Sequence, residues 1–211
     1  MGGRPTRSAA AGRRRLSLDG VVRRRRHSTE ANTVSQRYIL TGAPGSGKTT
    51  ILGALRQRGH HVVDEAATDI IHALAEQGVM EPWRRADFIE RIAALQRQRQ
   101  LAAERPGSTV FDRSPICTLA LAAYSHRSVP PVLAAELDRI TQENVYERRV
   151  FFVGNIGFVR PTVARRITYA ESLDFERIHR ETYRDLGYEI VDVEPGSVAE
   201  RVAVVESRIE T

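Results

Sequence analysis

Short apolar runs alternate along the chain with longer segments in which apolar positions recur every three or four residues. Each run is short enough to be a buried strand, and the segments between them have the period of helices. The expected strands lie at about residues 36–41, 60–64, 109–112, 150–153 and 188–193. Five apolar strands separated by helices predict an α/β fold in three layers, with a mainly parallel five-stranded sheet and helices on both faces.

Proline, serine and glycine mark where the expected helices begin and end. Ser114-Pro115 has the composition of a helix start, with a capping serine followed by proline in the first turn. Pro130-Pro131 predicts a helix that continues to about Arg148, and Pro195 predicts the start of the last helix. The stretch 65–108 is too long for one crossover helix, so we expect two helices there.

A glycine-rich stretch between the first expected strand and the first helix carries the clearest chemical signal. It matches G-x-x-x-x-G-K-[ST] in the strand–turn–helix context that a phosphate-binding loop requires. Glycines let backbone N–H groups approach phosphate oxygens, and the helix start adds the positive end of its dipole. The expected nucleotide-binding residues are Gly42, Ala43, Pro44, Gly45, Ser46, Gly47, Lys48, Thr49 and Thr50.

Lys48 is the only lysine in the chain. All the other basic residues among the 32 lysines and arginines are arginine, so the sequence uses lysine at this one position alone. Lysine is a compact point charge, whereas the planar guanidinium of arginine is too bulky for the same loop. We therefore expect Lys48 to contact the β- and γ-phosphates of a nucleoside triphosphate, and the Thr49 hydroxyl to bind Mg²⁺.

The positive charge of the chain belongs to its first residues. Residues 1–37 contain ten arginines against Asp19 and Glu30, whereas the remainder has a slight excess of acidic residues. We expect residues 1–35 to be a disordered tail and residues 36–211 to form one P-loop NTPase, AAA kinase-like domain. The tail is either a weak contact for polyanions or an extension without function, including a start codon assigned too early.

The nearly neutral domain argues against nucleic acid as its partner. No apolar run approaches the roughly 18 residues that span a membrane, and the start of the chain lacks the apolar segment of a signal peptide. The single cysteine, Cys117, cannot form an internal disulfide, which favours the cytoplasm.

Charged residues follow three of the expected strands at the edge where ligands of parallel sheets bind. Glu65, after the second strand, is a candidate general base, or else a helix cap, and is preferred to Asp64, which lies nearer the strand. Asp112, after the third strand, is a candidate Mg²⁺ contact, or else a helix cap. Arg113 would hold a phosphate or an acceptor, or else form a salt bridge.

The segment 160–166, after the fourth strand, contains two further candidates. Arginine side chains that close over a transferring phosphoryl group stabilise the charge on its oxygens. Arg165 and Arg166 are in a position to do this, although arginine is so frequent in this chain that a chance pair is the alternative.

Two classes of phosphate-loop protein do not fit the sequence. GTP-switch proteins recognise guanine with Asn-Lys-x-Asp, which this chain cannot contain because it has no second lysine. Ring-forming ATPases usually carry Asp-Glu at the end of the metal-binding strand, and here Asp112 is followed by arginine.

The chain resembles the P-loop kinases and, more closely, the NadR-type AAA domain family over residues 37–209. The residues that carry this resemblance are the glycine-rich loop, 63–67, 111–115, 160–166, and a late Phe175-Glu176, His179, Tyr183 and Leu186-Gly187-Tyr188 pattern. The resemblance implies strand order 2-3-1-4-5 and ATP·Mg²⁺ as ligand. It also implies that Glu65 is the base after the second strand and that Asp112-Arg113-Ser114 is the acidic-Arg-Ser motif of deoxynucleoside kinases.

The resemblance leaves two functions open. The first is a kinase that transfers the γ-phosphate of ATP·Mg²⁺ to a small hydroxylated acceptor, nucleoside-like molecules included. The second is a nucleotide-binding or slowly hydrolysing regulator that acts through a partner, because some members of the family are regulators, among them a GTP- and phosphoinositide-binding trafficking protein. No nicotinamide-specific residues match, so the acceptor, the choice between ATP and GTP, and the oligomeric state stay open.

Overall fold

A sheet of five parallel strands in the order β2-β3-β1-β4-β5 organises the chain. The computed structural model describes residues 35–157 and 167–209, which belong to one unit, Asn32–Thr211. The predicted α/β architecture and strand order are confirmed. The strands are β1 Ser35–Thr41, β2 His61–Val63, β3 Gly107–Asp112, β4 Arg149–Val153 and β5 Glu189–Val193.

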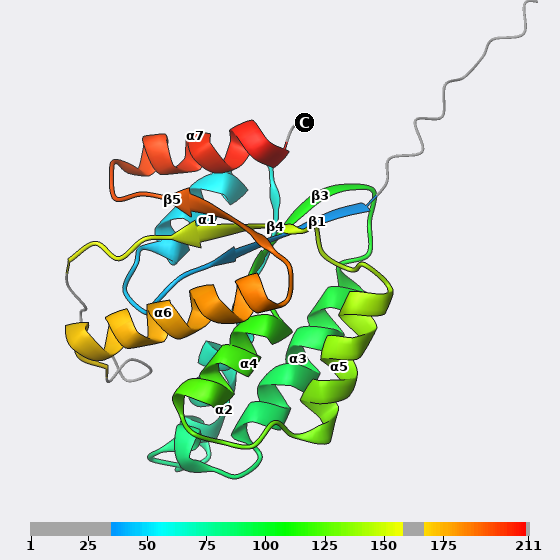
Figure 1. Cartoon of the computed structure of the whole chain (residues 1–211), viewed down its shortest axis with the longest axis vertical. Helices are drawn as coiled ribbons and strands as arrows, with labels where there is room; N and C mark the ends of the chain where they lie inside the picture. Colours follow the sequence, from blue (N-terminus) through cyan, green and yellow to red (C-terminus); the bar gives the residue numbers. More distant parts are fainter. Residues whose placement is uncertain (1–34, 158–166, 210–211) are drawn as a thin grey trace, which may run out of the picture. The chain divides into compact units, whose positions relative to one another are not determined.

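Helices cover both faces of the sheet (Figure 1). On one face lie α1 (Lys48–Gln57) and α7 (Val198–Ile209). On the other lie α4 (Pro115–Tyr124), α5 (Pro131–Gln142) and α6 (Tyr169–Asp185). The long stretch after β2 forms α2 (Ala66–Glu76), the short 3₁₀ helix η1 (Pro82–Arg84) and α3 (Phe88–Ala102), as the two-helix prediction required.

Alternation along the central strand explains the two cores. Successive side chains of a strand point to opposite faces, so Tyr38 and Leu40 pack with α1 and α7 while Ile39 packs with α4, α5 and α6. All three are at most 4% exposed. Because both faces of β1 are buried, the strand has no polar side to turn to water, and its carboxyl end is held firmly at the edge where the glycine-rich loop begins.

Two helix ends differ from the sequence prediction. The helix expected to reach Arg148 ends at Gln142, because Asn144 takes a left-handed conformation (φ 48°) and the next residues, Val145 and Tyr146, leave the helix to pack in the core. The last helix begins at Val198 rather than at Pro195. The Ser197 hydroxyl accepts from the Glu200 N–H while Glu200 accepts from the Ser197 N–H, and this reciprocal cap fixes the helix start.

Ser114 caps α4 as predicted, with its hydroxyl accepting from the Ile116 N–H at 3.3 Å and Pro115 in the first turn. Among the helices of the described residues, none is long and apolar enough to cross a membrane. The register pairs Leu40 of β1 with Asp112 of β3, so the start of the glycine-rich loop and the end of β3 lie side by side.

Candidate active site

The glycine-rich loop stands between β1 and α1, in the strand–loop–helix arrangement that its sequence predicts. Gly42, Gly45 and Gly47 all have positive φ, with values of 143°, 87° and 88°. A Cβ added at Gly42 would lie 2.4 Å from the Val153 carbonyl oxygen, so glycine is required there by close packing as well as by backbone conformation.

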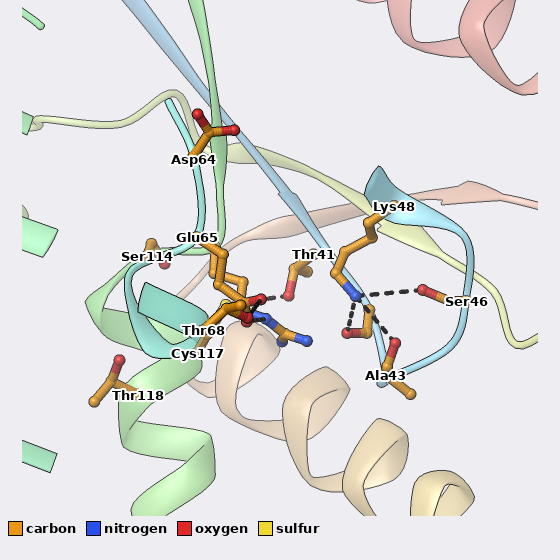
Figure 2. Close-up of polar contacts among 12 residues, drawn as sticks. Thr41, Ala43, Ser46, Lys48, Asp64, Glu65, Thr68, Ser114, Cys117 and Thr118 are labelled. Atoms are coloured by element: carbon orange, nitrogen blue, oxygen red, sulfur yellow. Dashed lines mark hydrogen bonds and ion pairs between the residues drawn. The ribbon is translucent and has the colours of Figure 1, made fainter. Parts of the chain in front are cut away.

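The Lys48 ammonium curls back over the loop that carries it (Figure 2). Its Nζ donates to the carbonyl oxygens of Gly42 and Ala43 at 3.0 Å each and to the Ser46 hydroxyl at 3.4 Å. Burial and then the charge of Arg113 lower the pKa of Lys48 to about 8, although nearby carboxylates oppose this. Lys48 is therefore a buried cation whose charge the protein itself only partly stabilises.

Glu65 comes from the end of β2 and is held by two neighbours. Its Oε1 accepts from the Arg113 Nε at 2.6 Å, and its Oε2 accepts from the Thr68 hydroxyl at 2.8 Å. Burial alone would raise the pKa of Glu65, but Arg113 and Lys48 more than offset it, and the pKa lies below its ordinary value. Glu65 is an ionised carboxylate in a fixed position near neutral pH.

Asp64, by contrast, points away from this group and pairs with Arg56 at 2.8 Å on the surface (Figure 2). Its side chain is 70% exposed. The preference for Glu65 over Asp64 is consistent with this geometry, because only Glu65 lines the cleft described below.

Asp112, at the end of β3, has a carboxylate that the protein leaves partly unsatisfied. Its Oδ1 is buried and has no hydrogen-bond partner among the described residues. Burial and then the negative charge of Glu65 raise the pKa of Asp112 to about 6. Mg²⁺ prefers hard oxygen ligands, so this orphaned oxygen, with the Thr49 hydroxyl lining the same cleft, fits such an ion.

Arg113 has a left-handed backbone (φ 69°), which is unusual for a residue with a side chain. Its N–H donates to the Leu40 carbonyl at 3.1 Å, which anchors the turn to β1. Its guanidinium donates through Nε to Glu65 and lies with Nη1 3.4 Å from the His179 Nε2. The sequence left a phosphate contact and a salt bridge as alternatives, and the structure places the salt bridge at the wall of the cleft.

His179, on α6, is fully buried and orients this arginine. Its Nδ1 lies 2.9 Å from the Phe175 carbonyl oxygen, which fixes the proton on Nδ1 and leaves the Nε2 lone pair facing Arg113. Burial and then the charge of Arg113 lower the pKa of His179 to about 3, so the ring is neutral. The edge-to-face contact with Phe175 further limits its rotation.

A chain of buried hydrogen bonds ties the end of β1 to α4 and α6. It runs from the Thr41 hydroxyl to the Cys117 Sγ (3.1 Å), then to the Tyr183 hydroxyl (3.0 Å) and the Ser114 hydroxyl (2.9 Å). Each group in this chain satisfies another in the interior, where an unpaired polar group would be costly. The chain makes the floor of the site rigid.

These groups lie at one end of a cleft of about 960 Å³. Lys48, Thr49, Glu65, Asp112 and Arg113 all line it. The cleft continues past them between α2, α3 and α4, well beyond the glycine-rich loop, and the space there is large enough for a second small molecule.

The comparisons with known proteins agree with this geometry. A family model described as AAA domain matches residues 37–201. The chain belongs to the AAA domain family. The resemblance of its sequence to NadR-type AAA domains, with a P-loop NTPase fold, is confirmed.

Solved structures similar to this AAA domain include two of NadR, one described as a complex with NAD and AMP-PNP and one with NR. They align with TM-scores of 0.61 and 0.62 at 14% identity over 84% of this chain, which spans only about half of the NadR chain. Deoxyadenosine kinase from M. mycoides with bound dCTP aligns with a TM-score of 0.55 at 10% identity, and the alignment covers 83% of this chain and 99% of the kinase. Thymidylate kinase from Candida albicans aligns with a TM-score of 0.51 at 13% identity, and the alignment covers 83% of this chain and 91% of the kinase. At these identities the likeness shows the fold alone. No curated protein matches the chain.

Two residues of the AAA domain that the sequence analysis gave no role belong to the site. His179 was part of the motif pattern, and its spacing with Phe175 and Tyr183, four residues apart each time, could have placed all three on one face of a helix. Arg201 of α7 is 6% exposed and donates to the Ser46 carbonyl at 2.7 Å, behind the phosphate loop. Only the fold brings it there, because it lies 155 residues away in sequence.

Arg165 and Arg166 lie outside the residues that the structure describes, so their proposed closure over a phosphoryl group stays a prediction. Within residues 35–157 and 167–209, no group of three or more His, Cys, Asp or Glu could hold a metal ion. A metal at Asp112 would thus take much of its coordination from a ligand rather than from the protein, as Mg²⁺ bound with nucleotide phosphates does.

Proposed function

We propose that this protein is an ATP-dependent phosphotransferase that transfers the γ-phosphoryl group of ATP·Mg²⁺ to a hydroxyl of a small acceptor, nucleoside-like molecules included. The observation that carries this proposal is the position of Glu65. It is an oriented carboxylate that lines the same cleft as the phosphate loop, at the point where the cleft continues toward α2, α3 and α4.

Each group at this end of the cleft has a role in such a reaction. Lys48 and the loop N–H groups would bind the β- and γ-phosphates, and their partly uncompensated positive charge favours an anion there. Thr49 and Asp112 would hold Mg²⁺, which when bound neutralises charge that develops on the phosphate oxygens. Arg165 and Arg166 would add positive charge around the transferring phosphoryl group.

In the transfer step, Glu65 takes the proton of the acceptor hydroxyl. The acceptor hydroxyl oxygen forms a bond to the γ-phosphorus while the bond from that phosphorus to the β–γ bridging oxygen breaks, and ADP leaves with that electron pair. The hydroxyl proton passes to the Glu65 carboxylate, which is ionised at neutral pH because its pKa is lowered. Arg113 and Thr68 hold the two oxygens of Glu65, so the carboxylate keeps one orientation toward the cleft.

The size of the cleft favours this proposal over a regulator that only binds nucleotide. A regulator needs a site for the nucleotide and a surface for its partner, whereas here the cavity continues past Glu65 toward α2, α3 and α4, with space for an additional small molecule. The cytoplasm, with its ATP and reducing conditions, is the compartment we propose for this chemistry.

The test measures ADP release by the purified protein with ATP·Mg²⁺ and a panel of hydroxylated metabolites, in parallel with ATP binding. Glu65→Gln should lower acceptor-dependent turnover by roughly 10²–10⁴-fold, the usual contribution of a positioned base. ATP affinity should change little, because the phosphates are held by the loop and Lys48.

Asp64→Asn is the matched control, since it removes the neighbouring carboxylate on the surface, and it should leave turnover unchanged. Equal turnover in wild type and Glu65→Gln would remove Glu65 from the mechanism. Nucleotide binding without ADP release for any acceptor would instead favour the regulator.

A further inference from the structure

The part of the cleft beyond Glu65 is lined mainly by apolar side chains. Ile71 comes from α2, Phe88 and Ile92 from α3, Leu121 from α4 and Phe175 from α6. The helices α2, α3 and α4 pack on one another through a shared apolar cluster, and α6 packs on α4, so the walls have a fixed shape. A ligand in this space meets hydrocarbon and aromatic surface from all four helices, which favours an apolar body.

Three polar side chains in the same region, those of Gln96, Thr118 and Thr68, are already paired within the protein. The Gln96 amide donates to the Ser114 carbonyl at 3.0 Å and accepts from the Thr118 hydroxyl at 2.8 Å. Both side chains are at most 8% exposed. The Thr68 hydroxyl is used by Glu65. A ligand that took the Gln96 amide oxygen for itself would leave the buried Thr118 hydroxyl without its acceptor.

The arginines at the outer end of the cleft are engaged in the same way. Arg84 pairs with Glu81 at 3.0 Å, and Arg127 donates to the carbonyl oxygens of Trp83 and Arg85 at 2.6 and 2.5 Å. At the inner end the carboxylates of Glu65 and Asp112 face the cleft. A negatively charged acceptor body would meet two carboxylates and would have to draw an arginine from its existing partners.

We propose that the acceptor is a neutral alcohol, with a hydroxyl that reaches Glu65 and an apolar or aromatic body held by contact with the walls rather than by hydrogen bonds. This inference rests on the proposed function, whose acceptor class it narrows. The faces of a flat ring can pack against the apolar walls, whereas polar atoms at the edge of that ring find no free hydrogen-bond partner in the Gln96 amide. An apolar ring should therefore bind better than a hydrogen-bonding ring on the same sugar.

The chain contains a built-in reporter for this test. Trp83 is the only tryptophan of the protein and lines the cleft. A change in intrinsic tryptophan fluorescence on titration therefore reports a ligand at this site whether or not any phosphoryl transfer follows. Calorimetric titration of the same samples gives the affinity independently of the fluorescence.

Two matched pairs of ligands separate the alternatives. Phenyl C-riboside and uridine share their sugar and differ in the edge of the ring, while benzyl alcohol and 4-(hydroxymethyl)benzoate differ by one carboxylate. We expect phenyl C-riboside to bind at least about tenfold more tightly than uridine, and benzyl alcohol to bind more tightly than its carboxylate. Tighter binding of uridine or of the carboxylate, or no binding by any of the four, overturns the inference.

A variant pair tests the apolar wall directly. Leu121→Asn places a polar group on the half-buried cleft wall. It should weaken the binding of phenyl C-riboside roughly tenfold and the binding of uridine far less. Leu101→Asn makes the same substitution on α3 outside the cleft lining, where the side chain is 50% exposed. It should leave the affinities for both ligands unchanged. Equal losses for both ligands in Leu121→Asn, with a native melting temperature, overturn the inference.

ADP release, measured on the same samples, keeps the two proposals apart. Preferential binding of the apolar ligands without ADP release for any alcohol supports the apolar site and contradicts the phosphotransferase. ADP release with uridine but not with phenyl C-riboside supports the phosphotransferase and overturns the apolar acceptor.

Discussion

ATP affinity should depend on pH through the single lysine. In the protein without nucleotide, Lys48 has a pKa lowered to about 8, because it is buried and close to Arg113. A bound triphosphate adds negative charge next to the ammonium, which favours its protonated form. The pKa of Lys48 in the complex is then expected to return to at least its ordinary value, and nucleotide binding takes up a proton wherever the free protein has lost it.

The size of the effect follows from these two pKa values. Above pH 8 the free protein is increasingly neutral at Lys48, so part of the binding free energy is used to protonate it again. With a pKa of about 8 when free and about 10.4 or above when bound, the dissociation constant should rise roughly eightfold between pH 7.5 and pH 9. Affinity is therefore highest below pH 8 and falls as the pH rises through it. This range lies above the titration of the terminal phosphate, near pH 6, and above the pKa of Asp112, about 6.

The assay is anisotropy titration of a fluorescent ATP analogue, with Mg²⁺ and ionic strength held constant, at half-unit steps of pH. Lys48→Met is the control, because it should bind more weakly at every pH and show no slope over the same range. An ATP affinity of the wild type that does not change with pH, or an equal change in Lys48→Met, would refute the claim that Lys48 supplies the positive charge that binds the phosphates.

Two further predictions concern the residues that hold the site in place. His179 is neutral in the folded protein with a pKa of about 3, whereas the unfolded chain protonates below about pH 6.5, so protonation favours unfolding as the pH falls. In urea unfolding, the free energy of unfolding of the wild type should fall by about 2 kcal/mol more between pH 7 and pH 5 than that of His179→Phe. Identical falls in the two proteins would contradict a buried neutral ring. Arg201→Met removes the hydrogen bond to the Ser46 carbonyl and should weaken ATP binding by roughly tenfold or more, whereas Arg208→Met, on the exposed side of α7, should leave it unchanged; equal affinities in the two variants would contradict a role for Arg201 in shaping the loop.

The fold was predictable because its signals are local. Each strand is a short apolar run, and the two faces of β1 are encoded by adjacent residues such as Ile39 and Leu40. The errors lie at helix ends, where one residue decides. Asn144 stops α5 by a left-handed turn, and the reciprocal cap between Ser197 and Glu200 sets the start of α7. Pro195, from which the start of the last helix was predicted, permits a helix but does not determine the residue at which it begins.

The location of the candidate site could be predicted where its residues directly follow a strand. The glycine-rich loop, Glu65 and Asp112 each follow a strand, and parallel strands bring their carboxyl ends to one edge. Contacts between distant segments were not accessible in this way. Nothing local to Arg201 indicates that it contacts Ser46, and nothing local to Gln96 indicates that its amide is taken by Ser114 and Thr118.

At Arg113 the backbone has a cost in stability that the proposed function would account for. A left-handed backbone costs a residue with a Cβ roughly 1–2 kcal/mol, and glycine would carry no such cost. The strain exists because three consecutive residues serve three directions: Asp112 faces the cleft, Arg113 reaches Glu65, and Ser114 caps α4. A chain selected for stability alone would place glycine here, and it would keep the turn while losing the guanidinium that orients Glu65. Under the proposed function the strained arginine is kept because it orients Glu65, which sets this turn apart from the glycine turns that end other elements of the fold, such as the one at Gly59 after α1.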